Sequence, residues 1–277
     1  MRAEPQSDIR DVFDTVAEDY DRTGVEFFGP VGERLVELTD IRPGDAVLDV
    51  GCGRGAVLLP AARATGPSGR AIGIDLSFAM VAAVRRDAHA RGLRQADAVV
   101  MDGQTPSFCP AGFDAVTGGM SVHMLSDLPA AYRAYHRLLR PGGRLALSAP
   151  TTVDHPQTRV FGLHSVARLS AGHDTGSTVY PNAPAFGGTA LARSQLAAAG
   201  FQDIKAVEES TLITAASAEH FLRWTWTHGM RALWERIPAA ERRLAEEEIV
   251  AEARARSEAP DKLVLRVPIL YLLAHRP

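Results

Sequence analysis

The sequence predicts an α/β fold built on a largely parallel sheet with helices on both faces. The first observation is a rhythm of short β-rich runs and helical runs between Ala46 and about residue 149. The second is V-L-D-V-G-C-G-R-G-A, residues 47–56, where a strand passes into three closely spaced glycines. Alternating strands and helices favour right-handed βαβ units, and a glycine-rich turn after the first strand is typical of a nucleotide site in such folds.

The elements expected before residue 150 follow from periodicity and turn residues. Apolar residues at helical spacing predict a helix over 8–21, with Ser7 as a candidate N-cap, and a second amphipathic helix that ends near residue 39. Strands are expected at 46–50, 71–75, 97–101, 113–118 and 143–149, with helices near 55–66, 77–91 and 127–139. The run L-L-R-P-G-G, residues 138–143, indicates a helix end followed by a tight turn.

The pattern changes after residue 150. Residues 151–188 are rich in Thr, His, Gly and Pro, with one short helix possible near 160–170, and the segment is too long for a plain connection. It is therefore predicted to shape a site or a lid. A helix is expected at 189–199, strands at 202–213 and 263–274, and two helices between those strands, at 217–236 and 239–257.

The composition argues against several classes of protein. A chain of 277 residues with 46% hydrophobic residues can bury one substantial core, and its net charge of −3 offers no broad cationic surface for nucleic acid. Cys52 and Cys109 lack metal-ligand spacing and suit a reducing compartment. No apolar run approaches the roughly 18 residues that a membrane span needs. We therefore expect a cytoplasmic protein with no metal, membrane or nucleic-acid partner.

The glycine turn admits two interpretations. As G-x-G-x-x-A it matches a dinucleotide site, and as D-x-G-x-G-x-G it matches a nucleoside site that holds no phosphate. Asp75 ends the next strand and suits a ribose diol in either case. Asp49 discriminates, because a diphosphate beside this carboxylate at about 4 Å would be repelled by several kcal/mol at an effective dielectric of about 20. The site therefore favours a cation such as the methionine end of S-adenosylmethionine.

Asp102 supports that choice. It closes the third strand in V-V-M-D-G, where a carboxylate can accept from an adenine amino group while Met101 and Gly103 flank the ring. Each aspartate by itself could be a cap or a turn former. Three aspartates at three successive strand ends are better explained by one ligand.

Several motifs carry a family resemblance. V-L-D-V-G-C-G-R-G, I-G-I-D-L-S, V-M-D-G, F-D-A-V-T-G-G-M-S-V-H-M-L-S-D and L-L-R-P-G-G-R-L-A-L resemble the successive motifs of class I S-adenosylmethionine-dependent methyltransferases, over roughly residues 12–150. F-D-T-V-A-E-D-Y-D, residues 13–21, is similar to the segment that opens the quinone-methylating members. The resemblance implies a Rossmann-like seven-stranded sheet of order 3-2-1-4-5-7-6 with the last strand antiparallel, so that Pro268 needs an edge position or a bulge.

The resemblance also implies roles for individual residues. The cofactor would be S-adenosylmethionine, with S-adenosylhomocysteine as product. Its methionine portion would lie on the first-strand turn, its ribose and adenine on the second and third strands, and its sulfonium under the turn after the fourth strand. The residues expected to bind it are Tyr20, Asp49, Gly51, Cys52, Gly53, Gly55, Asp75, Leu76, Met101, Asp102, Gly103, Gly119 and Met120.

The acceptor side rests on histidines and aromatic residues. Methyl transfer needs a base only if the acceptor atom keeps a proton, and His123 and His155 are the candidate bases because they follow the fourth and fifth strands. Trp224 and His228 share a face of the 217–236 helix, beside a second apolar stripe that would pack on the sheet. Core packing is the alternative for the tryptophans, and a plain polar loop position is the alternative for each histidine. The acceptor pocket is predicted to use Phe27, His123, His155, Trp224 and His228.

These observations predict a methyltransferase for a small, fairly apolar metabolite, with oxygen favoured over carbon as the acceptor atom and natural-product biosynthesis as its setting. A catalytically silent cofactor binder acting as a scaffold or regulator is the alternative. A nicotinamide oxidoreductase is disfavoured by Asp49, and a nucleic-acid methyltransferase by the charge and by the missing N-P-P-[YF] motif. The N-terminal helix could exchange between subunits of a homo-oligomer. The expected organisation is a helical lid segment over 1–40, the cofactor-binding core over 41–150, an insert near the acceptor pocket over 151–188, and the end of the sheet over 189–277 with a helical cap at 217–257.

Overall fold

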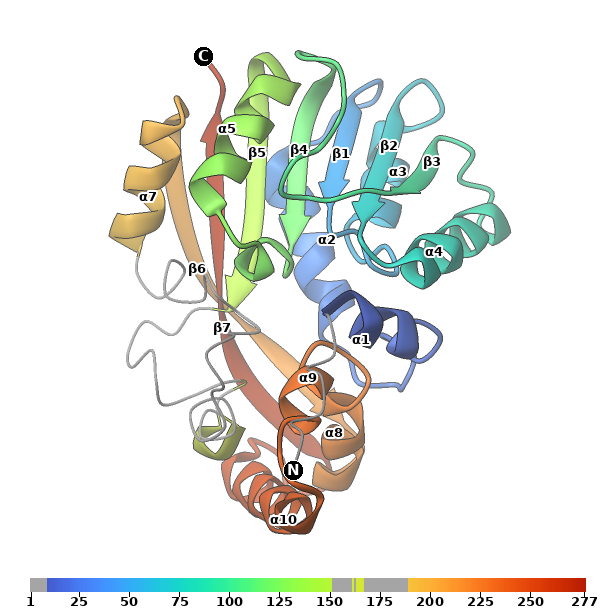
Figure 1. The fold of residues 1–277 in the computed structure, drawn as a ribbon, viewed down its shortest axis with the longest axis vertical. Helices are drawn as coiled ribbons and strands as arrows, with labels where there is room; N and C mark the ends of the chain where they lie inside the picture. Colours follow the sequence, from blue (N-terminus) through green and yellow to red (C-terminus); the bar gives the residue numbers. More distant parts are fainter. Residues whose placement is uncertain (1–8, 151–160, 162, 167–188) are drawn as a thin grey trace, which may run out of the picture.

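A seven-stranded sheet forms the centre of the computed structural model, which describes residues 9–150, 161, 163–166 and 189–277 (Figure 1). The strand order is β3-β2-β1-β4-β5-β7-β6, and only β7 runs antiparallel to its neighbours, which confirms the predicted fold class. The strands are β1 (Ala46–Val50), β2 (Arg70–Asp75), β3 (Ala96–Val100), β4 (Phe113–Gly119), β5 (Leu139–Pro150), β6 (Gln202–Ala215) and β7 (Leu263–His275).

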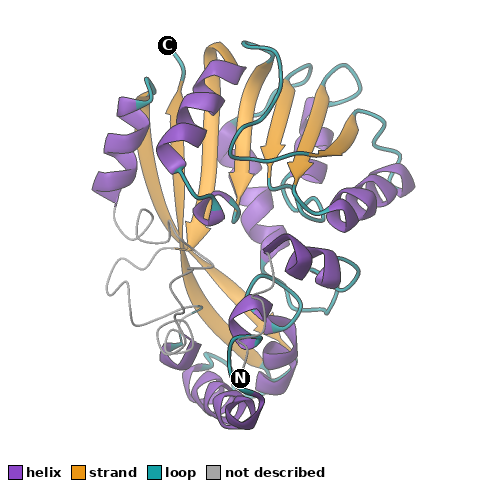
Figure 2. Ribbon diagram, in the orientation of Figure 1, coloured by secondary structure: helices purple, strands orange, loops and turns teal. Residues whose placement is uncertain are grey.

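Helices cover both faces of the sheet (Figure 2). Alternate residues of β1 enter different cores: Val47 packs with residues of α2, α3 and α4, and Leu48 packs with residues of α5 and α7. The helices are α1 (Ile9–Val16), α2 (Phe28–Thr39), α3 (Leu58–Thr65), α4 (Phe78–Ala90), the 3₁₀ helix η1 (Val122–Met124), α5 (Leu128–Leu138), α7 (Thr189–Ala198), α8 (Ala218–Thr225), α9 (Arg231–Trp234) and α10 (Ala239–Arg256).

Short polar side chains begin several of these helices. Ser77 accepts from the N–H of Met80 at the start of α4, and Asp127 accepts from the N–H of Ala130 at the start of α5. Each such cap satisfies a backbone donor that the first helical turn leaves unpaired. The caps fix where the chain turns from strand to helix, at the same edge of the sheet that carries the aspartates and glycines of the sequence motifs.

The β6–β7 pair extends beyond the rest of the sheet and carries α8 and α10 (Figure 1). β5 pairs with β7 only from Ile269 onward, whereas β6 pairs with β7 along its whole length. Pro268 therefore lies one residue outside the β5 ladder and has a strand neighbour on one side only, opposite Ser210. The proline occupies a locally edge-like position within an interior strand, which is how the fold meets the constraint expected from the sequence.

The prediction of a single helix over 217–236 is wrong. The structure divides it into α8 and α9, with His228 and Gly229 in the non-helical segment between them. The hydroxyls of Thr225 and Thr227 donate to the carbonyls of Leu222 and Trp224, and Gly229 has low helix propensity. Local hydrogen bonding and glycine thus end the helix, although the apolar periodicity continues through the break.

Two searches of the described residues found no candidates. No helix there has the length and apolar content to cross a membrane. No three or more His, Cys, Asp or Glu side chains in the described ranges are grouped so that they could hold a metal ion. The expected division into segments at residues 40, 150 and 188 stays a prediction, and α2 packs directly against β4 and β5.

Candidate active site

The carboxyl ends of β1 and β4 border a narrow hollow, which we call the central cavity. Seven of the predicted cofactor residues line it: Tyr20, Asp49, Gly51, Cys52, Gly53, Gly119 and Met120. Seven residues that were not predicted also line it: Asp21, Phe28, Val31, Gly32, Arg54, Ala56 and Val57. The strand ends therefore meet in space as the sequence pattern predicted, and the additional residues come from the N-terminal segment, including α2, and from the glycine turn itself.

The three glycines of the turn have different roles. Gly53 has φ +47°, and a Cβ built on it would meet no atom within 4 Å, so its missing side chain leaves open space. Gly55 has φ +87°, and a Cβ there would collide with Leu59 and Val84 at 2.7 Å. Gly53 therefore allows a ligand to approach the backbone, whereas Gly55 allows helix packing behind it, which differs from its predicted place in the cofactor cradle.

Asp49 is buried in the wall of the central cavity, with 1% of its surface exposed. Its Oδ1 accepts a hydrogen bond from the Thr117 hydroxyl at 2.9 Å, and it also accepts from the N–H of Leu58. Burial raises the pKa of Asp49 to about 7, and the neighbouring Asp75 carboxylate adds to the rise against these two hydrogen bonds. A buried carboxylate of this kind is stabilised by a cationic ligand and repels a phosphate.

Asp75 ends β2 and connects the second strand to the glycine turn. Its Oδ2 accepts from the N–H of Gly53 and its Oδ1 from the N–H of Ser77, both at 2.9 Å. Burial raises its pKa, while these N–H donors act in the opposite direction. Each oxygen retains a lone pair, so the carboxylate can accept hydrogen bonds from the two hydroxyls of a ribose diol.

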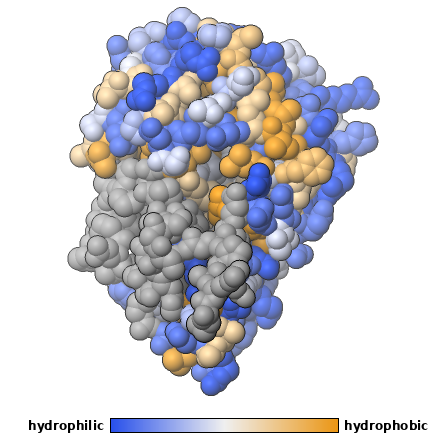
Figure 3. All heavy atoms as spheres, viewed as in Figure 1, coloured by the Kyte–Doolittle hydropathy of each residue, from blue (hydrophilic) through white to orange (hydrophobic). Residues whose placement is uncertain are grey.

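The ends of β2 and β3 form an apolar shelf with one acidic edge. The N–H of Met101 donates to the carbonyl of Asp75 at 2.9 Å, which holds the two strand ends together. Leu76 is 42% exposed and Asp102 is exposed, and apolar side chains gather on this face of the molecule (Figure 3). Gly103 is buried, and its carbonyl accepts from the Tyr135 hydroxyl at 2.7 Å. A flat heteroaromatic ring with an amino donor suits this combination.

The turn after β4 is strained at Met120, which has φ +52°. Its N–H donates to the backbone carbonyl of Ser148 at 3.0 Å, and this contact holds the turn against β5. A Cβ on Gly119 would lie 2.5 Å from Val57 Cγ2. The chain therefore passes close to the glycine turn here, and a non-glycine residue with positive φ lines the cavity, as strained residues at functional sites often do.

The N-terminal segment closes one side of the central cavity. The rings of Tyr20 and Phe28 stack with centroids 5.0 Å apart, and both line the cavity. Asp21 also lines it, with φ +55°, and burial raises the pKa of this carboxyl to about 6, while Arg54 lowers it. Sequence reasoning missed Asp21. Its signal was the Tyr-Asp pair that ends F-D-T-V-A-E-D-Y-D, of which only the tyrosine was selected.

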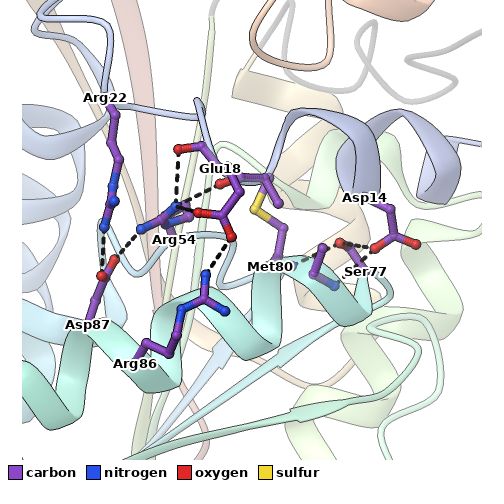
Figure 4. A network of polar contacts seen from close by, with 10 residues as sticks. Asp14, Glu18, Arg22, Arg54, Ser77, Met80, Arg86 and Asp87 are labelled. Atoms are coloured by element: carbon purple, nitrogen blue, oxygen red, sulfur yellow. Dashed lines mark hydrogen bonds and ion pairs between the residues drawn. The ribbon is translucent and has the colours of Figure 1, made fainter.

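Arg54, inside the glycine turn, ties the N-terminal helix to α4 (Figure 4). Its side chain is only 5% exposed, donates to the carbonyl of Ala17 at 2.7 Å and pairs with Asp87 at 2.6 Å. Arg22 also pairs with Asp87, and Arg86 pairs with Glu18. On the other side of α1, the Ser77 hydroxyl donates to Asp14. The same turn thus shapes the cavity and anchors the segment that covers it.

The donor set fits S-adenosylmethionine. The buried carboxylate of Asp49 suits its ammonium group, and the open space at Gly53 allows it to approach the backbone. The carboxylate of Asp75 suits its ribose, and the neighbouring apolar shelf suits its adenine. A family model described as a methyltransferase domain matches residues 47–143. The chain is 39% identical over 272 residues to nocamycin O-methyltransferase of Saccharothrix syringae, a match that covers 94% of this chain and 96% of that protein. The chain belongs to the S-adenosylmethionine-dependent methyltransferases.

Two further comparisons agree. The methyltransferase is 44% identical over 142 residues to aklanonic acid methyltransferase DauC of Streptomyces sp. (strain C5), covering 51% of this chain and 64% of that protein. A solved structure of phosphoethanolamine N-methyltransferase 2 from Haemonchus contortus with S-adenosyl-L-methionine has a TM-score of 0.61 and 18% identity, and covers 98% of this chain and 60% of that one. The first relates the methyltransferase to natural-product enzymes, and the second shows the shared fold.

The predicted acceptor residues fall into separate groups. Phe27, Trp224 and His228 lie in one buried group of rings, which we call the aromatic cluster, together with Phe28, Phe161 and Phe221. His123 lies in η1 and is 6% exposed, and burial lowers its pKa to about 4. His155 lies outside the described residues. The aromatic cluster borders the central cavity through Phe28, which contacts both Trp224 and His228.

Proposed function

We propose that this methyltransferase transfers the methyl group of S-adenosylmethionine to an oxygen atom of a small, largely apolar acceptor in natural-product biosynthesis. The observation that carries the proposal is the continuity between the central cavity and the aromatic cluster at Phe28. Aromatic rings are the residues that most often bury an apolar or aromatic ligand. The name of the relative that matches along nearly its whole length, nocamycin O-methyltransferase, supports oxygen as the acceptor atom and a natural product as the setting.

The roles of the chain's own residues follow from their positions. When bound, S-adenosylmethionine supplies a methyl group on a positively charged sulfur that departs as a neutral thioether. Asp49 and Asp21 hold the ammonium group, Asp75 the ribose diol, and Asp102 the adenine amino group. Tyr20 and Phe28 exclude water over the glycine turn. Catalysis then consists mainly of aligning the acceptor atom, the methyl carbon and the sulfur in a dry site.

A general base is the least supported part of the earlier hypothesis. His123 has a pKa of about 4 because it is buried, and so weak a base is a poor proton acceptor at neutral pH. His155 stays a candidate. An acceptor oxygen that carries no proton would need neither histidine.

Calorimetry tests the cofactor assignment directly. We expect S-adenosylhomocysteine to bind with micromolar or tighter affinity and NAD to give no heat. Methyl transfer from methyl-labelled S-adenosylmethionine to the extract of a producing bacterium, followed by mass spectrometry, then tests turnover. Binding of the homocysteine product without any labelled methyl product would favour the silent scaffold, whereas binding of NAD would contradict the cofactor assignment.

Three predictions concern the surroundings of the enzyme. We infer that it acts in the cytoplasm, that the insert over 151–188 borders the acceptor, and that the N-terminal helix can exchange between two copies. The cysteine usage, the length of the insert and the amphipathic N-terminal segment support these inferences. Light scattering on the full chain and on a chain that begins after residue 23 tests the third. If the full chain is a dimer and the shortened chain is also a dimer, helix exchange is contradicted.

A further inference from the structure

The aromatic cluster contains two buried nitrogen atoms that the described structure leaves without hydrogen bonds. Trp224 is 0% exposed and His228 is 4% exposed, and their ring centroids lie 4.3 Å apart. Neither Trp224 Nε1 nor His228 Nε2 has a partner among the described residues. Most buried polar side-chain atoms in proteins do have one, so two neighbouring exceptions require an explanation.

His228 acts as a donor at Nε2. Its Nδ1 accepts a hydrogen bond from the backbone N–H of Met230 at 3.4 Å. Burial lowers the pKa of His228 to about 3, so the ring is neutral and carries one proton. Because Nδ1 is the acceptor, that proton is assigned to Nε2. The indole nitrogen of Trp224 is always a donor, so the cluster holds two N–H groups without an acceptor in the described part of the chain.

The surroundings of these donors are apolar rings. Phe28 lies 5.5 Å and Phe161 lies 5.7 Å from the His228 ring, and both also contact Trp224. Trp234 provides a contrast a few residues away. Its Nε1 donates to the Thr225 hydroxyl at 2.9 Å, and it is equally buried. The fold therefore satisfies one buried indole and leaves the other, which contacts the cavity-lining Phe28, without an acceptor among the described residues.

We propose that the N–H groups of Trp224 and His228 bind an acceptor oxygen that carries no proton, in the first place a carboxylate. This rests on the proposed function, because the donors lie one ring, Phe28, away from the central cavity. A hydroxyl oxygen could also accept these hydrogen bonds, but the hydroxyl's own proton would then find no acceptor, because both groups are donors. A carboxylate or ketone oxygen needs only donors.

A carboxylate also agrees with the chemistry of the site. Its oxygen forms the new C–O bond with the methyl carbon, the electron pair of the C–S bond leaves with the sulfur, and no proton is released. The reaction therefore needs no base, which suits a site where His228 and His123 are buried and neutral. The negative charge is buried beside the positive sulfur, and transfer neutralises both charges in a medium of low dielectric.

Three ligands of one shape test the proposal by binding rather than turnover. The probes are 2-naphthoate, 2-acetylnaphthalene and 2-ethylnaphthalene, titrated into protein saturated with S-adenosylhomocysteine. We expect the wild-type chain to bind 2-naphthoate at least about tenfold more tightly than 2-ethylnaphthalene, as for hydrogen bonds to a charged group. Trp224→Phe should abolish this preference. Trp234→Phe removes the same atoms from a paired indole and should retain it.

The outcomes separate clearly. A preference for 2-acetylnaphthalene over both other probes would assign the donors to a ketone oxygen and overturn the carboxylate. Equal affinity for all three, or a preference that survives in Trp224→Phe, would overturn the donor pair. If Trp224→Phe does not fold, His228→Phe carries the same expectation. Binding of S-adenosylhomocysteine is measured first, so that its absence, which would refute the proposed function, is distinguished from failure of this inference.

Discussion

Asp75 Oδ2 accepts a hydrogen bond from the backbone N–H of Gly53 at 2.9 Å. This contact joins the acidic end of β2 to the glycine turn after β1, so the residue that we propose holds the ribose also positions the turn that we propose holds the methionine portion. The second oxygen accepts from the N–H of Ser77 at the start of α4. One side chain therefore sets the relative positions of three elements around the proposed cofactor site.

Replacing Asp75 by Asn should weaken cofactor binding while the chain still folds. The amide loses charge and one acceptor, and hydrogen bonds to a charged group contribute about 1.5–3 kcal/mol each, so the dissociation constant of S-adenosylhomocysteine should rise roughly 10- to 100-fold. Calorimetry measures it. Asp97→Asn, in an exposed pair with Arg85, is the control and should bind like wild type. Equal affinity of the two variants would contradict the placement of the ribose.

Cofactor affinity should rise with pH between 6 and 8. The pKa of Asp49 in the folded chain is raised to about 7, so this group binds a proton more tightly when folded, and its contribution to stability is lost as the pH rises through 7. An ammonium ligand needs the ionised form of Asp49. The ionised fraction of a group with a pKa of about 7 rises about tenfold between pH 6 and 8, so the affinity should rise about tenfold over this range. Calorimetry at several pH values tests it.

Asp49→Asn should remove most of that pH dependence and weaken binding at pH 8. Asp102→Asn alters a different part of the site and should weaken binding with the wild-type slope retained. A slope unchanged in Asp49→Asn would assign the titration to another group, of which Asp21, with a pKa of about 6, is the first candidate.

Gly53→Ala should retain the fold and lose the cofactor. Both Gly53 and Gly92 have positive φ, and a Cβ on either meets no atom within 4 Å. Replacing either by Ala therefore costs about 1–2 kcal/mol of backbone strain and no collision within the chain. Urea unfolding should show similar losses for the two variants, whereas only Gly53→Ala should weaken S-adenosylhomocysteine binding. Normal binding by Gly53→Ala would mean that the cofactor does not approach this turn.

Arg54→Met should release the N-terminal helix. The change breaks the pair between the buried Arg54 side chain and the partly exposed Asp87, which keeps Arg22, and it breaks the bond to the carbonyl of Ala17. We expect a cost of about 1–3 kcal/mol. Hydrogen exchange of the amides in α1 should accelerate markedly. Arg86→Met removes an exposed pair with Glu18 and should cost less than about 1 kcal/mol. Equal protection of α1 in both variants would show that Arg54 does not anchor it.

The assignment of the cofactor residues stays a prediction, whereas the positions of the strand ends on which it depends were predicted correctly, because local pattern and topology suffice for them. Asp49, Asp75 and Asp102 each follow a short apolar run, and in a parallel sheet the carboxyl ends of neighbouring strands meet at one edge. Gly55 shows the limit of this reasoning. It stands in the same motif as Gly53, but its space is taken by Leu59 and Val84, which only the packing of α3 and α4 determines.

The acceptor side was predicted less completely. Phe27, Trp224 and His228 were selected and do share one cluster, yet Phe28 and Phe161 were not, since no local spacing relates them to α8. His228 was expected on a continuous helix and lies in a break, where its Nδ1 meets the N–H of Met230. That contact determines which nitrogen carries the proton, and the sequence contains no sign of it.

The sequence by itself determined the glycine turn and the acidic strand ends of this methyltransferase, because these depend on periodicity and on motifs of a few residues. The strand order followed from the family resemblance that these motifs carry. The tertiary structure alone decided which buried groups are paired. Arg54 pairs with Asp87 and donates to the carbonyl of Ala17, and Trp234 donates to Thr225. Trp224 and His228, beside Phe28, have no acceptor for their ring N–H groups among the residues that the structure describes. Pairing depends on contacts between segments far apart in the chain, and only their packing reveals which polar atom remains for the substrate.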